Sequence, residues 1–204
     1  APGVSTPFDQ YKMDALQNLM DDMEYSSYYG IGEAPTGGVR PKQVGIKQQI
    51  AATVAGNVTT SPTNASAYKP TDWIRDTLQK CRSNGGQPDL MLVATNFMTG
   101  LATWSQYVQR IDAGRTEFGH EIQTFYASFM PGVTIVEAPL LPSGVAICLT
   151  SSEVRMRMKR NEFWNPRGNR GDATEGEFIA EGAIELDNPG HHAWVEGITT
   201  FSAT

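Results

Sequence analysis

The stretch from Ser5 to Tyr29 constrains the fold more than any other part of this sequence. Ser5 or Thr6 is placed to act as an N-cap, Pro7 suits the first helical position, and Asp9 puts a carboxylate in the first turn. An apolar face follows at helical spacing, formed by Phe8, Tyr11, Leu16, Leu19, Met20, Met23 and Tyr28. We therefore predict an amphipathic helix about 36 Å long, at 1.5 Å per residue, which is long enough to cross a small domain.

The composition limits the class of protein. With 204 residues, 40% of them hydrophobic and 19% charged, the chain fits one domain or two small ones with a real core. No apolar run is long enough for a membrane span, so no membrane partner is predicted. The net charge of -6 argues against a surface that grips nucleic acid throughout. Cys81 and Cys148 are predicted to be buried free thiols, which fits a reducing, cytoplasm-type origin.

The order of secondary-structure signals predicts an α+β fold. A helix capped by Thr71 is expected over 72–83, a strand over 89–94 and another helix over 96–106. The segment 44–55 fits either a short strand or a helix. From Phe118 onward, strands separated by turns are expected, at 121–126, 133–137, 145–149, 153–158, 177–186 and 193–200. Helices first and strands last favour mixed or antiparallel sheets.

Enzyme signatures are incomplete in this sequence. His120-Glu121 begins like a zinc-protease HExxH motif, but Thr124 stands where the second histidine ligand is needed. Gly30-Ile31-Gly32 follows a helix rather than a strand and serves as a helix stop. His191-His192 follows a Pro-Gly turn, and one of these rings is expected to pack while the other is solvated. We predict no catalytic, cofactor-binding or metal-binding residues and no enzymatic activity.

Charges near the C-terminus are strongly segregated. Six cations and one carboxylate occupy 155–170, whereas 171–187 carries six carboxylates and no cation. On a strand, Arg155, Arg157 and Lys159 share one face. Three interpretations remain open: neutralisation of the two segments as cross-strand pairs within one molecule, head-to-tail contact between copies in a cyclic ring, or a nucleic-acid patch. The second interpretation predicts inter-subunit contacts by Arg155, Arg157, Lys159, Glu177, Glu181 and Glu185.

An ordered set of short motifs carries a resemblance to a known family. The motifs are, in chain order, Asn84-Gly85-Gly86-Gln87-Pro88-Asp89-Leu90-Met91, Thr116-Glu117-Phe118-Gly119, Met130-Pro131, Val154-Arg155-Met156-Arg157, Arg170-Gly171-Asp172-Ala173 and Ile184-Glu185-Leu186-Asp187-Asn188-Pro189-Gly190-His191-His192-Ala193. Together with the opening helix, this succession resembles the major capsid proteins of tailed phages with the Hong Kong 97-type fold. The likeness covers most of the chain.

This resemblance implies a shell subunit with two lobes. A peripheral lobe would hold residues 1–43, with the helix as its spine, and the return strands in 151–204. An α/β axial lobe would comprise 44–150. Family members ordinarily begin with an extended arm and a long hairpin loop ahead of the spine helix. Because this sequence starts at Ala1 and enters the helix almost at once, we expect these segments to have been removed or left out.

The resemblance also implies the function and partners. The expected protein is the major head protein of a tailed phage or prophage, which self-assembles as pentamers and hexamers into an icosahedral shell around DNA. It would need no cofactor, would touch DNA only indirectly, and would meet scaffolding or portal proteins while assembling in the bacterial host cytoplasm. Trp164 and Trp194 are expected to be exposed and to contribute to contacts between copies.

Two alternatives are kept beside this expectation. The first is an encapsulin-type cage of the same fold class, which encloses an enzyme instead of DNA. The second is an enzyme of unrecognised α+β fold, which would require Asp112, His120 and Glu121 to converge in one cleft.

Overall fold

The computed structural model describes residues 7–33, 42–60, 68–101, 104, 108–110, 122–127, 130–170 and 173–201. The chain divides into two compact units. The first combines Ala1–Ile46 with Met156–Glu185, and the second combines Lys47–Arg155 with Leu186–Thr204. The predicted N-caps Ser5 and Thr6 lie outside the described residues.

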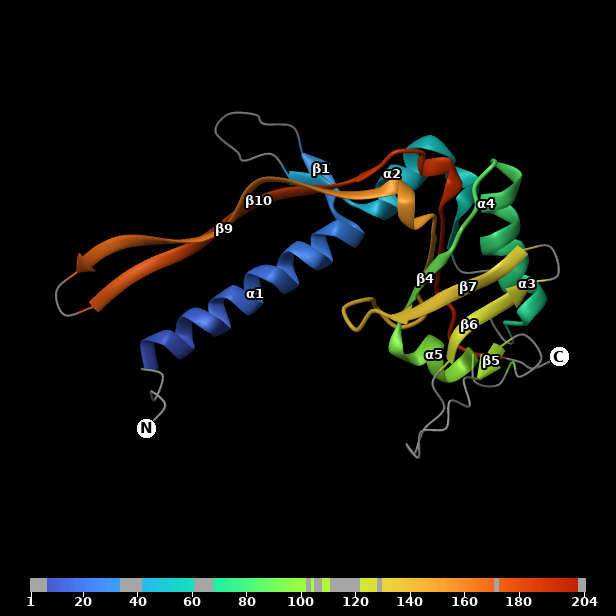
Figure 1. The fold of residues 1–204 in the computed structure, drawn as a ribbon, viewed down its shortest axis with the longest axis horizontal. Helices are drawn as coiled ribbons and strands as arrows, with labels where there is room; N and C mark the ends of the chain where they lie inside the picture. The colour runs from blue at the N-terminus through green and yellow to red at the C-terminus, as the bar shows by residue number, and fades with distance from the viewer. Residues whose placement is uncertain are drawn as a thin grey trace. The chain divides into compact units, whose positions relative to one another are not determined.

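The first unit consists of one long helix and two antiparallel pairs of strands (Figure 1). Helix α1 spans Pro7–Tyr29, which confirms the predicted helix. Strand β1 (Ile31–Glu33) pairs with β2 (Lys42–Val44). The longest strands, β9 (Val154–Arg170) and β10 (Ala173–Leu186), form a two-stranded ribbon alongside α1.

One face of α1 packs against the ribbon of its own unit. The Phe8 ring meets the Trp164 ring edge-on, with centroids 6.0 Å apart. At Gly182, a Cβ atom would lie 3.4 Å from the terminal methyl of Met23, so the absence of a side chain there allows close approach. Tyr11 and Met20, which the spacing places on the apolar face, are exposed instead. The ribbon is two strands wide and covers only part of the predicted apolar face.

The second unit is built on a mixed seven-stranded sheet with the order β3-β11-β8-β4-β7-β6-β5. Two neighbouring pairs, β4 with β7 and β11 with β3, are parallel, and the other pairs are antiparallel. The strands are β3 (Val58–Thr60), β4 (Leu90–Val93), β5 (Val108–Arg110), β6 (Ile122–Ala127), β7 (Met130–Glu137), β8 (Ala146–Leu149) and β11 (Ala193–Glu196). The predicted α+β class with a mixed sheet is confirmed.

The helices of the second unit follow the predicted order. Segment 44–55 contains helix α2 (Ile46–Thr53). The helix expected over 72–83 is continuous from Pro70 to Ser83, as α3 (Pro70–Ile74), a π-helical turn η2 (Arg75–Gln79) and α4 (Lys80–Ser83). The prediction that Thr71 caps it was wrong, because Pro70 starts the helix and Lys69 is the N-cap.

The next helix, α5, spans Thr95–Leu101. The end predicted for it falls partly outside the described residues.

Aromatic side chains form the centre of the core in the second unit. The ring centroids of Trp73 and Phe97 lie 4.6 Å apart, and Trp104 and Phe201 pack around them. Gly100 faces the Phe201 ring so closely that a Cβ atom would overlap it. Cys81 and Cys148 are buried free thiols, as predicted.

Strand β11 belongs to the sheet of the second unit, where it lies between β3 and β8. Strand β11 therefore belongs to a different sheet from β10, although we predicted that both are return strands of one lobe. The assignment of the two units to a peripheral and an axial lobe stays a prediction.

Candidate inter-subunit surface

Five cation–carboxylate pairs form an ion-pair ladder between β9 and the chain from Glu177 to Asp187. They are Arg155–Asp187 (2.8 Å), Arg157–Glu185, Lys159–Glu181 (3.3 Å), Arg160–Glu181 (3.6 Å) and Arg167–Glu177. All six residues predicted to contact another subunit therefore have an oppositely charged partner inside the same chain. This geometry is the cross-strand neutralisation that the sequence left open as one interpretation.

The exposure of these pairs limits their contribution to stability. The cationic side chains of the ladder remain between 52% and 79% exposed. Exposed ion pairs of this kind contribute about 0.2–1 kcal/mol each, since water screens them. The ladder therefore stabilises the subunit only weakly, and its charged groups remain accessible to solvent. The predicted contact of these groups with a neighbouring copy stays a prediction.

Trp164 takes part in the contact between the ribbon and α1. Its ring lies 5.0 Å from that of Phe178 in an edge-on arrangement, and the Lys12 ammonium lies 5.0 Å from its centroid. The indole is half-buried rather than exposed. Trp194 was also predicted to be exposed, and this was wrong: it is fully buried on β11, where its Nε1 donates to Glu196. Both corrections follow from tertiary packing partners distant in the sequence.

Strand β9 is far more exposed than β10. Every residue from Arg155 to Phe163 is exposed, whereas every residue of β10 from Glu177 to Gly182 is half-buried. The exposed stretch includes three large apolar side chains, Met156 (47%), Met158 (37%) and Phe163 (43%). The sequence predicted only the first part of this strand, because Asn161, Asn165, Pro166 and Gly168 are residues that strands disfavour.

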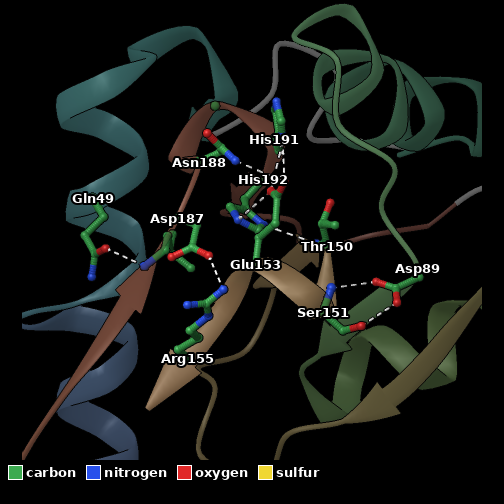
Figure 2. Close-up of polar contacts among 12 residues, drawn as sticks. Gln49, Asp89, Thr150, Ser151, Glu153, Arg155, Asp187, Asn188, His191 and His192 are labelled. Atoms are coloured by element: carbon green, nitrogen blue, oxygen red, sulfur yellow. Dashed lines mark hydrogen bonds and ion pairs between the residues drawn. The ribbon is translucent and has the colours of Figure 1, made fainter. Parts of the chain in front are cut away.

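A polar cluster in the second unit joins the turn 151–153 to the segment 186–192 (Figure 2). Glu153, in the 3-10 turn η3 (Ser151–Glu153), accepts a hydrogen bond from Asn188 Nδ2 at 3.1 Å and lies 2.9 Å from Nδ1 of His191. Its backbone oxygen accepts from the Asp187 amide at 2.9 Å. The Leu186 amide donates to Gln49 Oε1 at 3.0 Å. These bonds hold the segment 186–191 against η3 and α2 within the second unit.

The two adjacent histidines of this cluster have different environments, as the sequence predicted. His191, at the end of the 3-10 turn η4 (Pro189–His191), is partly exposed, whereas His192 is fully buried. The Thr150 amide donates to His192 Nδ1 at 3.2 Å, so the neutral ring carries its proton on Nε2. That nitrogen has no hydrogen-bond partner and lies 3.9 Å from Glu153 Oε2.

Burial sets the protonation of the cluster. Burial lowers the pKa of His192 to about 4, although the nearby Glu153 carboxylate acts in the opposite direction. Burial raises the pKa of Glu153, but the hydrogen bonds from His191 and Asn188 outweigh it and hold that pKa below its ordinary value. At neutral pH the cluster therefore contains a neutral His192 beside an ionised Glu153.

The cluster is not arranged as a nucleophile–base pair. Ser151 donates to Asp89 through both its amide, at 2.7 Å, and its hydroxyl. His192 directs its acceptor nitrogen to the Thr150 amide rather than to a hydroxyl. The arrangement positions backbone instead of activating a side chain.

The enzyme alternative rests on residues that the structure does not describe. Asp112, His120 and Glu121 all lie outside the described residues. Among the residues that are described, no group of three or more histidines, cysteines or carboxylates is placed to hold a metal ion. No helix in the described part of the chain is long and apolar enough to cross a membrane.

A family model for the SU10 major capsid protein matches residues 1–199. The chain belongs to this family. Its match covers nearly the whole chain and includes both units. No curated protein sequence matches this major capsid protein significantly.

Solved structures show the same fold at low sequence identity. The encapsulin SrpI from Synechococcus elongatus PCC 7942, in its holo complex, matches with a TM-score of 0.64 and 12% identity over 97% of this chain and 70% of its own. The procapsid of satellite phage P4, which includes the size determination (Sid) protein, matches with a TM-score of 0.55 and 11% identity over 94% and 67%. Both are shells with the Hong Kong 97-type fold, which confirms the predicted fold class.

The family match identifies the general function of the protein. The chain is a phage major capsid protein, and its location is the capsid of the virion. Its family implies a structural role, and the solved structures that share its fold are shells of many subunits. The likeness to an encapsulin shows the fold alone, so the encapsulin alternative has less support than the phage capsid.

Proposed function

We propose that this protein is the repeating subunit of an icosahedral phage head that encloses DNA, with identical subunits as its main partners. The match of the capsid-protein family to residues 1–199 carries the proposal. Pentamers and hexamers form in the host cytoplasm, with scaffolding and portal proteins as further partners. The protein has no enzymatic activity of its own, and many repeated contacts of modest strength hold the shell together.

The two lobes of this subunit correspond to the two structural units. The first unit, with α1 and the β9–β10 ribbon, is the peripheral lobe. The second unit, with the seven-stranded sheet, is the axial lobe around the five-fold and six-fold axes. The long helix beside a long ribbon supports the first assignment, and the compact sheet core supports the second.

Electron microscopy of the full-length gene product tests the proposal. Closed shells that contain DNA are the expected result. Shells that contain a co-purified protein instead of DNA would favour an encapsulin-type cage. A discrete monomer or dimer at assembly concentration would contradict both.

The contact of the ion-pair ladder with a neighbouring copy is the finer part of the proposal. Its support is the high exposure of the cations, which leaves them accessible although each has an internal partner. The charge swap Arg157→Glu with Glu185→Arg keeps the internal pair and exchanges the two charges on the surface. If a neighbouring subunit forms ion pairs with these charges, the swap should lower the shell yield. The melting temperature of the free subunit should change by less than about 2 °C.

A matched control separates internal from external effects. The single change Arg157→Glu loses the internal pair as well and places like charges opposite each other. Normal shell yield from the charge-swapped protein would show that the ladder acts within one molecule only.

A further inference from the structure

We propose that Cys81 and Cys148 form a latent disulfide site inside the second unit, which a peroxide closes once the protein leaves a reducing environment. The disulfide joins helix α4 to strand β8 and stabilises the unit. The site lies within one subunit, so its chemistry is independent of the proposed assembly. Only its timing, after release from the host cytoplasm, rests on the proposed function.

The fold brings the two cysteines of this chain together. Both are free thiols with no exposed surface, and their side chains share a hydrogen bond although the whole segment 82–147 separates them in the sequence. A buried cysteine also serves as a small apolar core residue. That role accounts for the burial of each thiol, but it does not require the two thiols to be neighbours.

The contact between the thiols follows from how the helix lies on the sheet. Cys148 lies opposite Met91 of β4 and Ala193 of β11 in the sheet register. These three residues belong to the same buried cluster as Cys81, whereas Ile147, next to Cys148 on β8, does not. Successive side chains of a strand point to opposite faces. The helix and the sheet therefore supply one sulfur atom each to the same face.

The end of the helix offers an oxidant a route to the thiols. Cys81 lies in the four-residue helix α4, and the residues after it, from Arg82 to Gly85, are exposed. Its carbonyl accepts from the amides of Asn84 at 3.2 Å and Gly86 at 2.9 Å. Helix ends open more readily than the core of a domain. Transient opening of these bonds admits a molecule as small as hydrogen peroxide.

The closing reaction balances with hydrogen peroxide as the oxidant. One thiolate attacks a peroxide oxygen, the O–O bond breaks, and a sulfenic acid and hydroxide form; the hydroxide takes up the proton of that thiol and becomes water. The second thiol then attacks the sulfenic sulfur, an S–S bond forms and a second water leaves. The two sulfur atoms together lose two electrons, and the peroxide gains them.

The environment of the thiols makes this reaction slow. Burial, together with the hydrogen bond to Cys81, raises the pKa of Cys148 well above its ordinary value. Little thiolate is therefore present at neutral pH, and the thiolate is the form that reacts with oxidants. The reductants of a cytoplasm keep such a pair open.

Mass spectrometry of the full-length gene product tests the site, in free subunits and in shells. The protein is purified with a reductant, treated with hydrogen peroxide after the reductant is removed, and digested without reduction. The expected product is one species that links the peptides containing Cys81 and Cys148 and that dithiothreitol separates. Cysteines recovered as free thiols or sulfinic acids, or linked between two copies, would overturn the proposal. Failure to form shells would count against the proposed function alone, because the link is detected within one subunit.

Thermal melting gives a second measurement. A disulfide that closes so long a loop restricts the unfolded chain, so the oxidised subunit should melt at least about 5 °C above the reduced one. Cys81→Ala is the matched control: the same treatment should give no linked peptide and no rise, which separates the disulfide from oxidation of methionines. An equal rise in the variant, or a linked protein with an unchanged melting temperature, would contradict the proposal.

Discussion

The two units of this capsid protein differ most in how they are stabilised. In the second unit, a large buried cluster includes Trp73, Phe97 and Trp104, and the Trp73 ring lies 4.6 Å from that of Phe97 and 6.4 Å from that of Trp104. In the first unit, the only buried apolar side chains among the described residues are Tyr28 and Ile46. Exposed ion pairs and half-buried aromatic contacts hold the ribbon and α1 instead. A unit with so little core is expected to gain much of its stability from neighbours, whereas the sheet unit does not need them.

The largest expected effect is in the core of the second unit. Phe97→Ala removes a fully buried ring that contacts Trp73 and Phe201, and it should lower the free energy of unfolding of that unit by about 3–5 kcal/mol. Urea denaturation followed by tryptophan fluorescence measures this loss. A loss below about 1 kcal/mol in the free energy of unfolding would contradict the view that buried packing stabilises the second unit more than the first.

The next effect is the acid sensitivity of the polar cluster. His192 has a pKa of about 4 in the folded chain against an ordinary value of 6.5, so the unfolded chain binds a proton at a higher pH than the folded chain does. The stabilisation is complete above pH 6.5 and is lost as the pH falls from 6.5 to 4. The shift corresponds to about 3 kcal/mol in the free energy of unfolding, since one pKa unit is about 1.4 kcal/mol.

His192→Asn is the matched control for this prediction. Its side-chain oxygen replaces Nδ1 as the acceptor of the Thr150 amide, and it removes the titrating group. The variant should lose most of the decline in stability between pH 6.5 and pH 4. An unchanged pH profile would assign the decline to groups other than His192. Glu153 does not account for it, because its pKa lies below the ordinary value and its contribution is lost only at lower pH.

The smallest effect is expected in the first unit. Trp164→Ala removes a half-buried ring between Phe8 and Phe178, and it should cost the free subunit about 1–2 kcal/mol, less than Phe97→Ala costs the second unit. Thermal melting of free subunits and of shells should show a larger loss in shells if neighbours support this unit. Equal losses in the two states would remove the distinction drawn between the units.

Much of the fold was accessible from local signals. Helix α1 followed from proline, an early carboxylate and glycines after its end, and β4 and β8 followed from short apolar runs between turns. The cap at Thr71 was wrong because a proline at Pro70 decided the start. The length of β9 was underestimated because its later residues have low strand propensity, and pairing with β10 overrides that preference.

For the candidate inter-subunit surface, the sequence predicted which charged residues are involved but not how they pair. Segregation of cations and carboxylates was plain in the sequence, but it left pairing within one molecule, contact between copies and a nucleic-acid patch all open. The tertiary structure decided that Arg157 meets Glu185 and Arg167 meets Glu177 within one chain. It also decided that Trp194 is buried and that β9 is exposed, because burial depends on contacts between residues far apart in the chain.

By itself, the sequence determined the class of this protein, its opening helix and the order of its elements, since caps, periodicity and turn residues act over a few positions. Only the tertiary structure decided which charges pair, which aromatic rings are buried and which strand of the ribbon is exposed. Those properties depend on contacts between segments that are far apart in the chain, and local sequence signals do not specify such contacts.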